Sequence, residues 1–155
     1  RESLFPWLRG KENILLGIKI NPNEGTCFQY QDLINQLDFP KSIDLTKYPY
    51  QLSGGQCQMI AIAQALILKR PILLLDEPFS ALDFDMQIKM ALSIRRIAKE
   101  NGITIIAILH NLNIAYYFSD RCILLGGTPT KIIGEESINE KRRENQILQN
   151  FPFNN

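Results

Sequence analysis

Residues 52–83 read LSGGQCQMIAIAQALILKRPILLLDEPFSALD, and this stretch carries the strongest structural signals in the chain. Its two adjacent glycines, Gly54 and Gly55, stand where a helix can begin, so backbone N–H groups there can be approached closely. Apolar residues then recur at helical spacing for about four turns, until Pro71 ends the helix. The four apolar residues 72–75 that follow are typical of a parallel strand covered on both faces.

Two acids close this strand. Asp76 and Glu77 stand at its carboxyl end, the edge at which open α/β sheets bind their ligands. An Asp in this position can help to hold Mg²⁺ on a nucleotide, and the next acid is then placed to orient and activate a water molecule. Many buried strands also end in Asp for structural reasons, so the pattern by itself leaves both interpretations open.

A lone histidine, His110, follows a second apolar run, TIIAIL. On its own, a histidine after a strand is more often structural than functional. Here it stands in one chain with LSGGQ, LLLDEP and the segment SALD at residues 80–83. This combination closely resembles the nucleotide-binding subunit of ABC transporters, and the resemblance covers residues 1 to about 134.

The resemblance implies a fold class and a domain organisation. We expect an α/β protein with a partial P-loop NTPase (ABC ATPase) fold, in which a mostly parallel sheet is joined by a small helical subdomain. Residues 1–51 would form the end of the Q-loop region and the helical subdomain. Residues 52–134 would form the signature helix and the C-terminal part of the catalytic α/β core. Residues 135–155 read as a polar tail, either solvated helix or disordered.

The resemblance also implies ATP and Mg²⁺ as cofactors and a role for each matching residue. The signature turn, which is Ser53, Gly54, Gly55 and Gln56, would close on the γ-phosphate of ATP held by the opposite subunit. Asp76 would be the Walker B aspartate that holds the metal. Glu77 and His110 would be the catalytic glutamate and the switch histidine, and Asp83 would lie in the D-loop along the dimer seam.

The remaining elements are expected from hydrophobic periodicity. Beyond the acids, an amphipathic helix is expected over residues 86–100, and Asn101-Gly102 closes it. The other expected elements are a short helix within 28–37, a second buried strand at 103–109, a helical segment at 111–118 and a third strand at 122–125. Residues 21–26 have the composition of a turn. The alternation of strands and helices independently favours a mostly parallel sheet.

The segment LFPWLRGKENILLG, residues 4–17, resembles the region just after the Q-loop in importers of nitrate, sulfonate or taurine type. An aromatic cluster beside a proline is most often ordinary packing. In the family, however, the groove that receives a coupling helix from the membrane subunit lies here. Both interpretations of the cluster stay open at this point.

Composition narrows the classes of function. The chain has 155 residues, enough for one domain, and its net charge is only +1 with no basic stripe, so no nucleic-acid partner is expected. The three cysteines are far apart, which suits free thiols in a reducing compartment. Apolar runs are strand-length, shorter than the roughly 20 residues that cross a bilayer, so any membrane role would be by docking.

One expected motif is missing from residues 1–155: no G-x-x-x-x-G-K-[ST] occurs. That loop supplies the N–H groups and the lysine that cradle nucleotide phosphates, so residues 1–155 alone should not bind ATP tightly. We expect the loop and the Q-loop glutamine to precede Arg1 in a longer chain. The family's arginines after the signature are replaced here by Cys57, Met59 and Gln64, and its acids after the histidine by Asn111 and Ile114.

Three functions are compatible with these features. The first is the C-terminal portion of the ATPase subunit of an importer. Its partners would be a second ATPase subunit and the permease subunits, and it would act with a solute-binding protein indirectly. Its solutes would be nitrate- or sulfonate-like anions, and its place the cytoplasmic face of the inner or cell membrane, or alternatively a plastid. The second is a degenerate, non-hydrolysing subunit that offers only its signature face. The third, an ABC ATPase acting on DNA or translation, lacks the expected coiled coils or duplicated cassettes.

Overall fold

The computed structural model describes residues 4–20 and 27–139. These residues fall into two compact units, Arg1–Ile108 and Leu109–Asn155, and each is described by itself. Two sequence-based expectations, the turn at 21–26 and the greater part of the polar tail, lie outside the described residues.

The first unit begins with helices. They are α1 (Gly10–Ile20), α2 (Tyr30–Gln36) and the short 3-10 helix η1 (Pro49–Gln51). The expected short helix within 28–37 is therefore present as α2, whereas α1 was not predicted as an element. The described residues before Leu52 contain helices and turns but no strand.

The loop before η1 supplies the start of α1. The backbone N–H groups of Gly10 and Lys11 donate to the carbonyl oxygens of Lys47 and Leu45, each at 2.9 Å. A helix begins with N–H groups that have no partner inside the helix, so these two carbonyls satisfy donors that would otherwise be open. The position of this loop therefore decides where α1 begins.

The same loop provides a pH-dependent contact. Asp44 Oδ1 accepts hydrogen bonds from the hydroxyl of Thr46 at 2.6 Å and from its N–H at 2.9 Å, and the hydroxyl contact is the main cause that lowers the pKa of Asp44. A lowered pKa means that the stabilisation is present above the ordinary Asp pKa and is lost as pH falls through the folded value.

Thr46→Val is expected to raise the pKa of Asp44, which an NMR titration of the carboxyl carbon measures. An unchanged pKa would assign the shift to other groups.

The centre of the first unit follows the sequence prediction closely. It contains α3 (Gly54–Leu66), β1 (Ile72–Asp76), α4 (Phe84–Asn101) and β2 (Thr104–Ile108). Strands β1 and β2 pair in parallel from Ile72 with Thr104 to Asp76 with Ile108. Gly102 ends α4 in the left-handed conformation with φ 65°, which a residue without Cβ adopts without steric cost.

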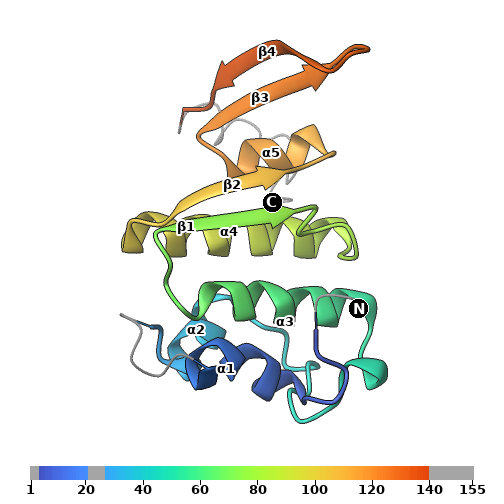
Figure 1. The fold of residues 1–155 in the computed structure, drawn as a ribbon, viewed down its shortest axis with the longest axis vertical. Coiled ribbons are helices and arrows are strands. Elements are labelled where there is room, and N and C mark those ends of the chain that lie inside the picture. Colours follow the sequence, from blue (N-terminus) through green and yellow to red (C-terminus); the bar gives the residue numbers. More distant parts are fainter. Residues whose placement is uncertain (1–3, 21–26, 140–155) are drawn as a thin grey trace, which may run out of the picture. The chain divides into compact units, whose positions relative to one another are not determined.

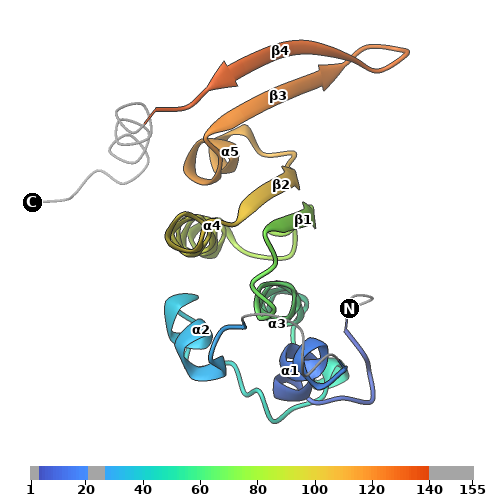
Figure 2. The same cartoon turned by 60° about the vertical axis from the view of Figure 1, so that its left-hand side comes forward.

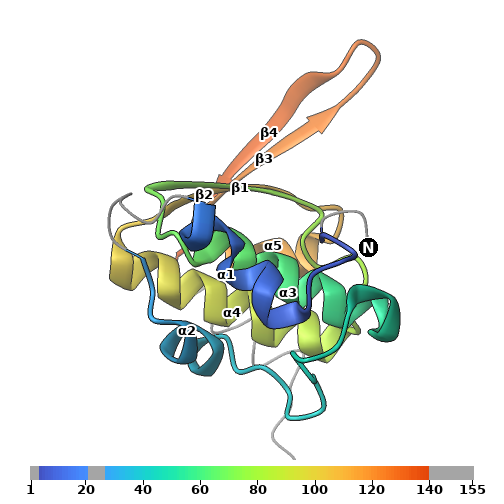
Figure 3. The same ribbon diagram turned by 60° about the horizontal axis from the view of Figure 1, so that its bottom comes forward.

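Helix α4 lies along one face of the β1–β2 pair (Figures 1 and 2), and α1 packs against α3 (Figure 3). The fully buried side chains of this unit include Ile14 of α1, Leu33 of α2, Ile60 and Leu66 of α3, and Met90, Ile94 and Ile97 of α4. The core of the unit therefore lies between helices and on the α4 side of the strands.

The prediction that β1 is covered on both faces is wrong for the described residues. Leu73 is 7% exposed, but its neighbours Ile72 and Leu74 are 59% and 71% exposed. The register partner of Leu74 on β2, Ile106, is 59% exposed as well. The reason is that successive side chains of a strand point to opposite faces, and within the described residues only the α4 face has a covering element.

The second unit contains α5 (Leu112–Phe118) and an antiparallel hairpin of β3 (Arg121–Gly126) and β4 (Lys131–Ser137). The expected helix at 111–118 and third strand at 122–125 are both present. The tail was expected to be helical or disordered from Glu135 onward, and this is wrong for its first three residues, which belong to β4. Pairing with β3 explains the difference, since Arg121 Nε lies 2.7 Å from Glu135 Oε1 across the hairpin.

Two further features concern the cysteines and the lengths of the helices. Cys27, Cys57 and Cys122 are free thiols, as expected from their spacing. Among the helices of residues 4–20 and 27–139, none combines the length and the apolar character that crossing a bilayer requires.

Candidate nucleotide site

The signature turn caps the start of α3. The hydroxyl oxygen of Ser53 accepts the N–H of Gln56 at 3.2 Å, and the side-chain oxygen of Gln56 accepts the N–H of Ser53 at 3.0 Å. This reciprocal pair is a capping box, and it explains why the helix begins at Gly54. The predicted helix start is confirmed. The positive end of the α3 dipole is therefore at this turn, which is where an anion is favoured.

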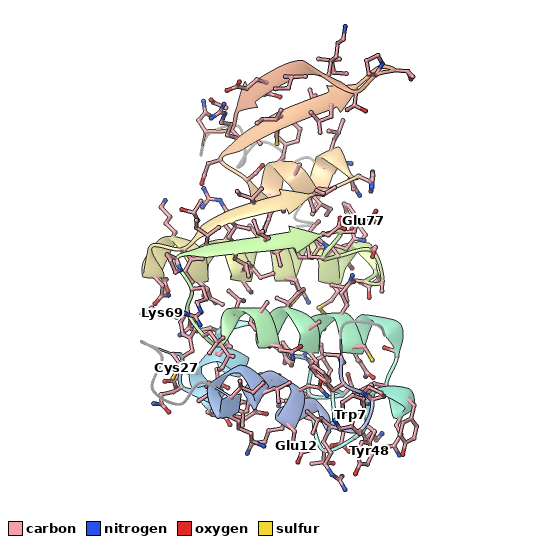
Figure 4. All side chains as sticks on the ribbon, viewed as in Figure 1. Trp7, Glu12, Cys27, Tyr48, Lys69 and Glu77 are labelled. Carbon is pink, nitrogen blue, oxygen red and sulfur yellow. The ribbon has the colours of Figure 1, made fainter. Side chains whose placement is uncertain are left out.

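The two acids lie at the carboxyl end of β1, as the sequence predicts. Asp76 is the last residue of the strand, in register with Ile108, and is exposed. Glu77 follows with φ 44°, a conformation that residues with a Cβ seldom adopt, and its N–H donates to the carbonyl of Ile108 at 3.1 Å. Figure 4 shows Glu77 beyond the end of the strand. Backbone strain of this kind is typical of functional positions.

The segment between β1 and α4 forms a compact loop, residues 77–83, called here the acid loop. The N–H and the hydroxyl of Ser80 both donate to the carbonyl oxygen of Glu77, at 3.3 and 3.2 Å. At its other end, Asp83 is the N-cap of α4, and its Oδ1 accepts the N–H of Met86 at 2.9 Å. Its carboxylate is therefore engaged with the helix that it starts.

Gln58, which belongs to none of the motifs recognised in the sequence, joins the signature helix α3 to the acid loop. Its Nε2 donates to the carbonyl of Glu77 at 3.0 Å and to the hydroxyl of Ser80 at 3.2 Å, and its Oε1 accepts the N–H of Ala81 at 2.9 Å. A signal was available, because Gln58 follows Gly55 by three residues and the two therefore share a helix face.

Gly55 permits this close approach. A Cβ at Gly55 would stand 2.9 Å from the carbonyl oxygen of Ala81, whereas a Cβ at Gly54 would meet only the Cβ of Ala81, at 3.8 Å. The glycine pair is therefore unequal. Gly54 borders open space, and Gly55 is the position where the helix touches the acid loop.

This asymmetry predicts opposite results for two neighbouring substitutions. Gly55→Ala is expected to lower the free energy of unfolding by about 1–3 kcal/mol, because the backbone must move to admit the methyl group. Gly54→Ala, the matched control, should be neutral or stabilising by up to about 1 kcal/mol, since alanine favours a helix. Urea denaturation of both variants checks this, and equal effects at the two positions would contradict the close contact.

His110 follows Ile108 by two residues in the chain and belongs to the second unit, whereas Asp76, Glu77 and the signature turn belong to the first. It is exposed. The structure thus brings the signature turn and the acid loop together within one unit. The predicted role of His110 stays a prediction.

The residues present fit a magnesium ion that is shared with a nucleotide. Within the part of the chain that the structure describes, no group of three metal-binding side chains lies together. Mg²⁺ is usually held by one or two carboxylates together with phosphate oxygens and water. The exposed carboxylate of Asp76 at a strand end suits that arrangement.

A second surface lies in the helical region. The aromatic surface, which is Phe5, Trp7, Tyr48 and Tyr50, contains an edge-to-face pair with centroids 5.4 Å apart and a stacked pair 5.6 Å apart. Trp7 and Tyr50 are 69% and 68% exposed, and Figure 4 places Trp7 and Tyr48 in the same part of the molecule. Ordinary core packing therefore does not account for these rings.

Two side chains hold this surface in place. The guanidinium of Arg9 lies 4.8 Å from the centroid of the Tyr48 ring and donates to the carbonyl of Thr46, so it joins the two halves. Asn13 is fully buried, and its amide bonds with Phe5 and with the carbonyls of Leu8 and Arg9. A buried amide with every partner satisfied rigidifies the loop that it holds.

The class of protein, an ATP-binding cassette, follows from the alignment of this fold with solved structures. The fold aligns with the bacterial ABC transporter cassette MJ0796, whose structure is dimeric, at a TM-score of 0.74 and 28% identity over 90% of this chain and 61% of that one. The same cassette bound to ADP and Pi aligns at 0.72, with 29% identity over 88% and 59% of the two chains. The α/β, P-loop NTPase fold class predicted from the sequence is confirmed.

The family follows from the sequence match. Residues 1–80 match the family model described as ABC transporter, and the chain belongs to this family. The segment that matches the model includes the signature turn, Asp76 and Glu77.

Several curated relatives are import ATP-binding proteins. An aliphatic sulfonates import protein from Xanthomonas axonopodis pv. citri is 37% identical over 83% of this chain and 52% of its own length. A nitrate import protein from Synechococcus elongatus is 36% identical over 86% and 49%. A thiamine import protein from Photobacterium profundum is 37% identical over 85% and 55%. The chain therefore spans about half the length of these relatives.

Proposed function

We propose that the protein encoded by this gene is the ATP-binding subunit of an ABC importer, and that it hydrolyses ATP as a head-to-tail dimer. One observation carries the proposal: the signature turn begins α3 beside the loop that carries Glu77, and both are exposed at one end of the unit. The dimeric cassettes with the same fold support the dimer.

In this proposal the residues divide the chemistry of phosphoryl transfer to water. Glu77 orients a water molecule and accepts its proton as the water oxygen attacks the γ-phosphorus, and the bond to ADP breaks. Asp76 would hold Mg²⁺, which would supply charge neutralisation at the phosphate oxygens. The N-terminus of α3 and the hydroxyl of Ser53, from the opposite protomer, face the γ-phosphate, and His110 contacts it.

The alternative function is a degenerate, non-hydrolysing subunit, which would apply if the loop G-x-x-x-x-G-K-[ST], not found in residues 1–155, were lacking from the encoded protein as well. A subunit that cannot grip ATP could still offer its signature turn to nucleotide held by another chain. Measuring ATP binding and turnover by the protein as its gene encodes it separates the two functions. Binding together with turnover supports the first, and their absence supports the second.

The aromatic surface suits the partner that an importer requires. Exposed rings fixed by Arg9 and the buried Asn13 form a preorganised apolar patch that could receive a helix of the membrane permease. The protein would then work at the cytoplasmic face of the membrane by docking. Trp7→Ala should weaken binding to permease subunits, and Trp7→Phe should retain part of it; equal retention in both would argue against this surface.

The transported solute is proposed only as a class. The LFPWL segment favours nitrate- or sulfonate-like anions, and sulfonate and nitrate import proteins are among the relatives. A thiamine import protein has equal identity, so identity alone does not choose between anions and other solutes. Growth on nitrate or a sulfonate as the sole source of nitrogen or sulfur, with and without the gene, tests this assignment.

Dimer formation tests the head-to-tail arrangement directly. In the Glu77→Gln background, where nucleotide should be retained, ATP and Mg²⁺ are expected to shift the encoded protein from monomer to dimer in sedimentation experiments. Adding Ser53→Arg should prevent the shift, because a bulky cation would fill the place of the terminal phosphate. A dimer that forms regardless of Ser53 would contradict this arrangement.

A further inference from the structure

We infer that Gln58 is a positioning residue: it ties the signature helix to the acid loop and holds the peptide of Glu77. Its consequence for catalysis rests on the proposed function, whereas the contact itself does not. Gln58 is half-buried on the first turns of α3 and lies between two segments that are far apart in sequence.

The side-chain amide of Gln58 uses both of its ends. As an acceptor, its oxygen takes the N–H of Ala81 at 2.9 Å. As a donor, its nitrogen reaches the carbonyl of Glu77 at 3.0 Å and the hydroxyl of Ser80 at 3.2 Å. A carboxylate could replace only the acceptor and an ammonium only the donor. An amide is therefore the side chain that this contact requires.

The peptide that Gln58 holds belongs to the residue proposed as the base. The N–H of Glu77 is bonded to Ile108 at the end of β2, and its carbonyl accepts from Gln58 and from Ser80. These bonds hold Glu77 at φ 44°, a conformation that persists only where the surroundings impose it. The backbone conformation sets the direction of a side chain, so Gln58 helps to aim the Glu77 carboxylate.

Close packing at Gly55 adds a second contact between α3 and the acid loop. Gly55 lies one turn before Gln58 on the same face of α3 and brings the helix backbone against the carbonyl of Ala81. The signature turn and the acid loop are thus joined at two adjacent points. A displacement of the signature turn, as when it meets the opposite protomer's nucleotide, would therefore move the peptide of Glu77.

Hydrogen exchange of backbone amides tests the contact. In Gln58→Ala, the amide of Ala81 should exchange about 3- to 10-fold faster, the effect of losing one hydrogen bond. In Gln58→Glu it should stay protected, because the carboxylate keeps the acceptor. Gln64→Ala, the same substitution two turns further along α3, is the control and should leave Ala81 unchanged. Unchanged exchange of Ala81 in Gln58→Ala would overturn the inference.

Kinetics of the encoded protein test the positioning role. Both Gln58→Ala and Gln58→Glu lose the donor to Glu77, so kcat should fall by about 10-fold in each while the KM for ATP stays within about twofold. Gln64→Ala should keep both constants. If the amide of Ala81 exchanges faster in Gln58→Ala but kcat is unchanged, Gln58 forms the contact without positioning Glu77. If the unsubstituted protein hydrolyses no ATP, the proposed function fails, and exchange at Ala81 alone then decides whether Gln58 forms the contact.

Discussion

Glu77→Gln is expected to reduce ATP turnover by the encoded protein at least about 100-fold, the usual contribution of a general base, while ATP binding persists. The amide has nearly the shape of the carboxylate but cannot accept the proton of the attacking water. The backbone bonds that fix residue 77 run through its N–H and carbonyl, so the substitution should leave the acid loop intact. Steady-state turnover and equilibrium nucleotide binding, measured on the same preparation, check both halves.

The matched control for this substitution is Glu100→Gln. Glu100 is exposed near the end of α4 and is remote from the acid loop in sequence, so the same loss of charge there should leave turnover within about twofold. Turnover retained in Glu77→Gln would exclude Glu77 as the base. Loss of nucleotide binding together with turnover would instead show that residue 77 acts in binding.

Local signals in the sequence were sufficient for the elements that carry the candidate site. The start of α3 is encoded by Ser53 and Gln56, which cap each other within four residues, and the end of α4 by Gly102. Capping depends on neighbours in the chain, so sequence alone reports it. The positions of Asp76 and Glu77 at a strand end are likewise predicted by a local signal, the apolar run 72–75 that precedes them.

Contacts between segments that are distant in the chain could not be predicted from the sequence. The bond between Gln58 and Ala81 joins residues 23 positions apart, and neither neighbourhood encodes it by itself. Strand β4 was missed because its apolar pair, Ile132 and Ile133, is followed by the polar residues of the tail, and only pairing with β3 makes that segment a strand. Pairings between such distant segments are known only from the folded structure.

Strand β1 has one covered and one exposed face, so substitutions of two adjacent leucines, Leu73 and Leu74, should differ greatly in their effect on stability. Leu73→Ala should lower the free energy of unfolding of the 155-residue chain by about 2–5 kcal/mol, because it leaves a cavity on the face covered by α4. Leu74→Ala should cost less than about 0.5 kcal/mol, since its side chain is 71% exposed and surface substitutions have small effects. Both variants make the same chemical change at neighbouring positions of one strand. Denaturant titrations of the two therefore report burial rather than residue type.

A continuous apolar run cannot distinguish these two leucines, because it lacks the alternation that marks a half-covered strand. The two variants supply that distinction by experiment. A cost above about 1 kcal/mol for Leu74→Ala would mean that this face of β1 is packed in the folded chain, as the sequence pattern predicts. A small cost for Leu73→Ala would mean that α4 does not cover the strand, and the arrangement that presents Asp76 and Glu77 at its end would then need revision.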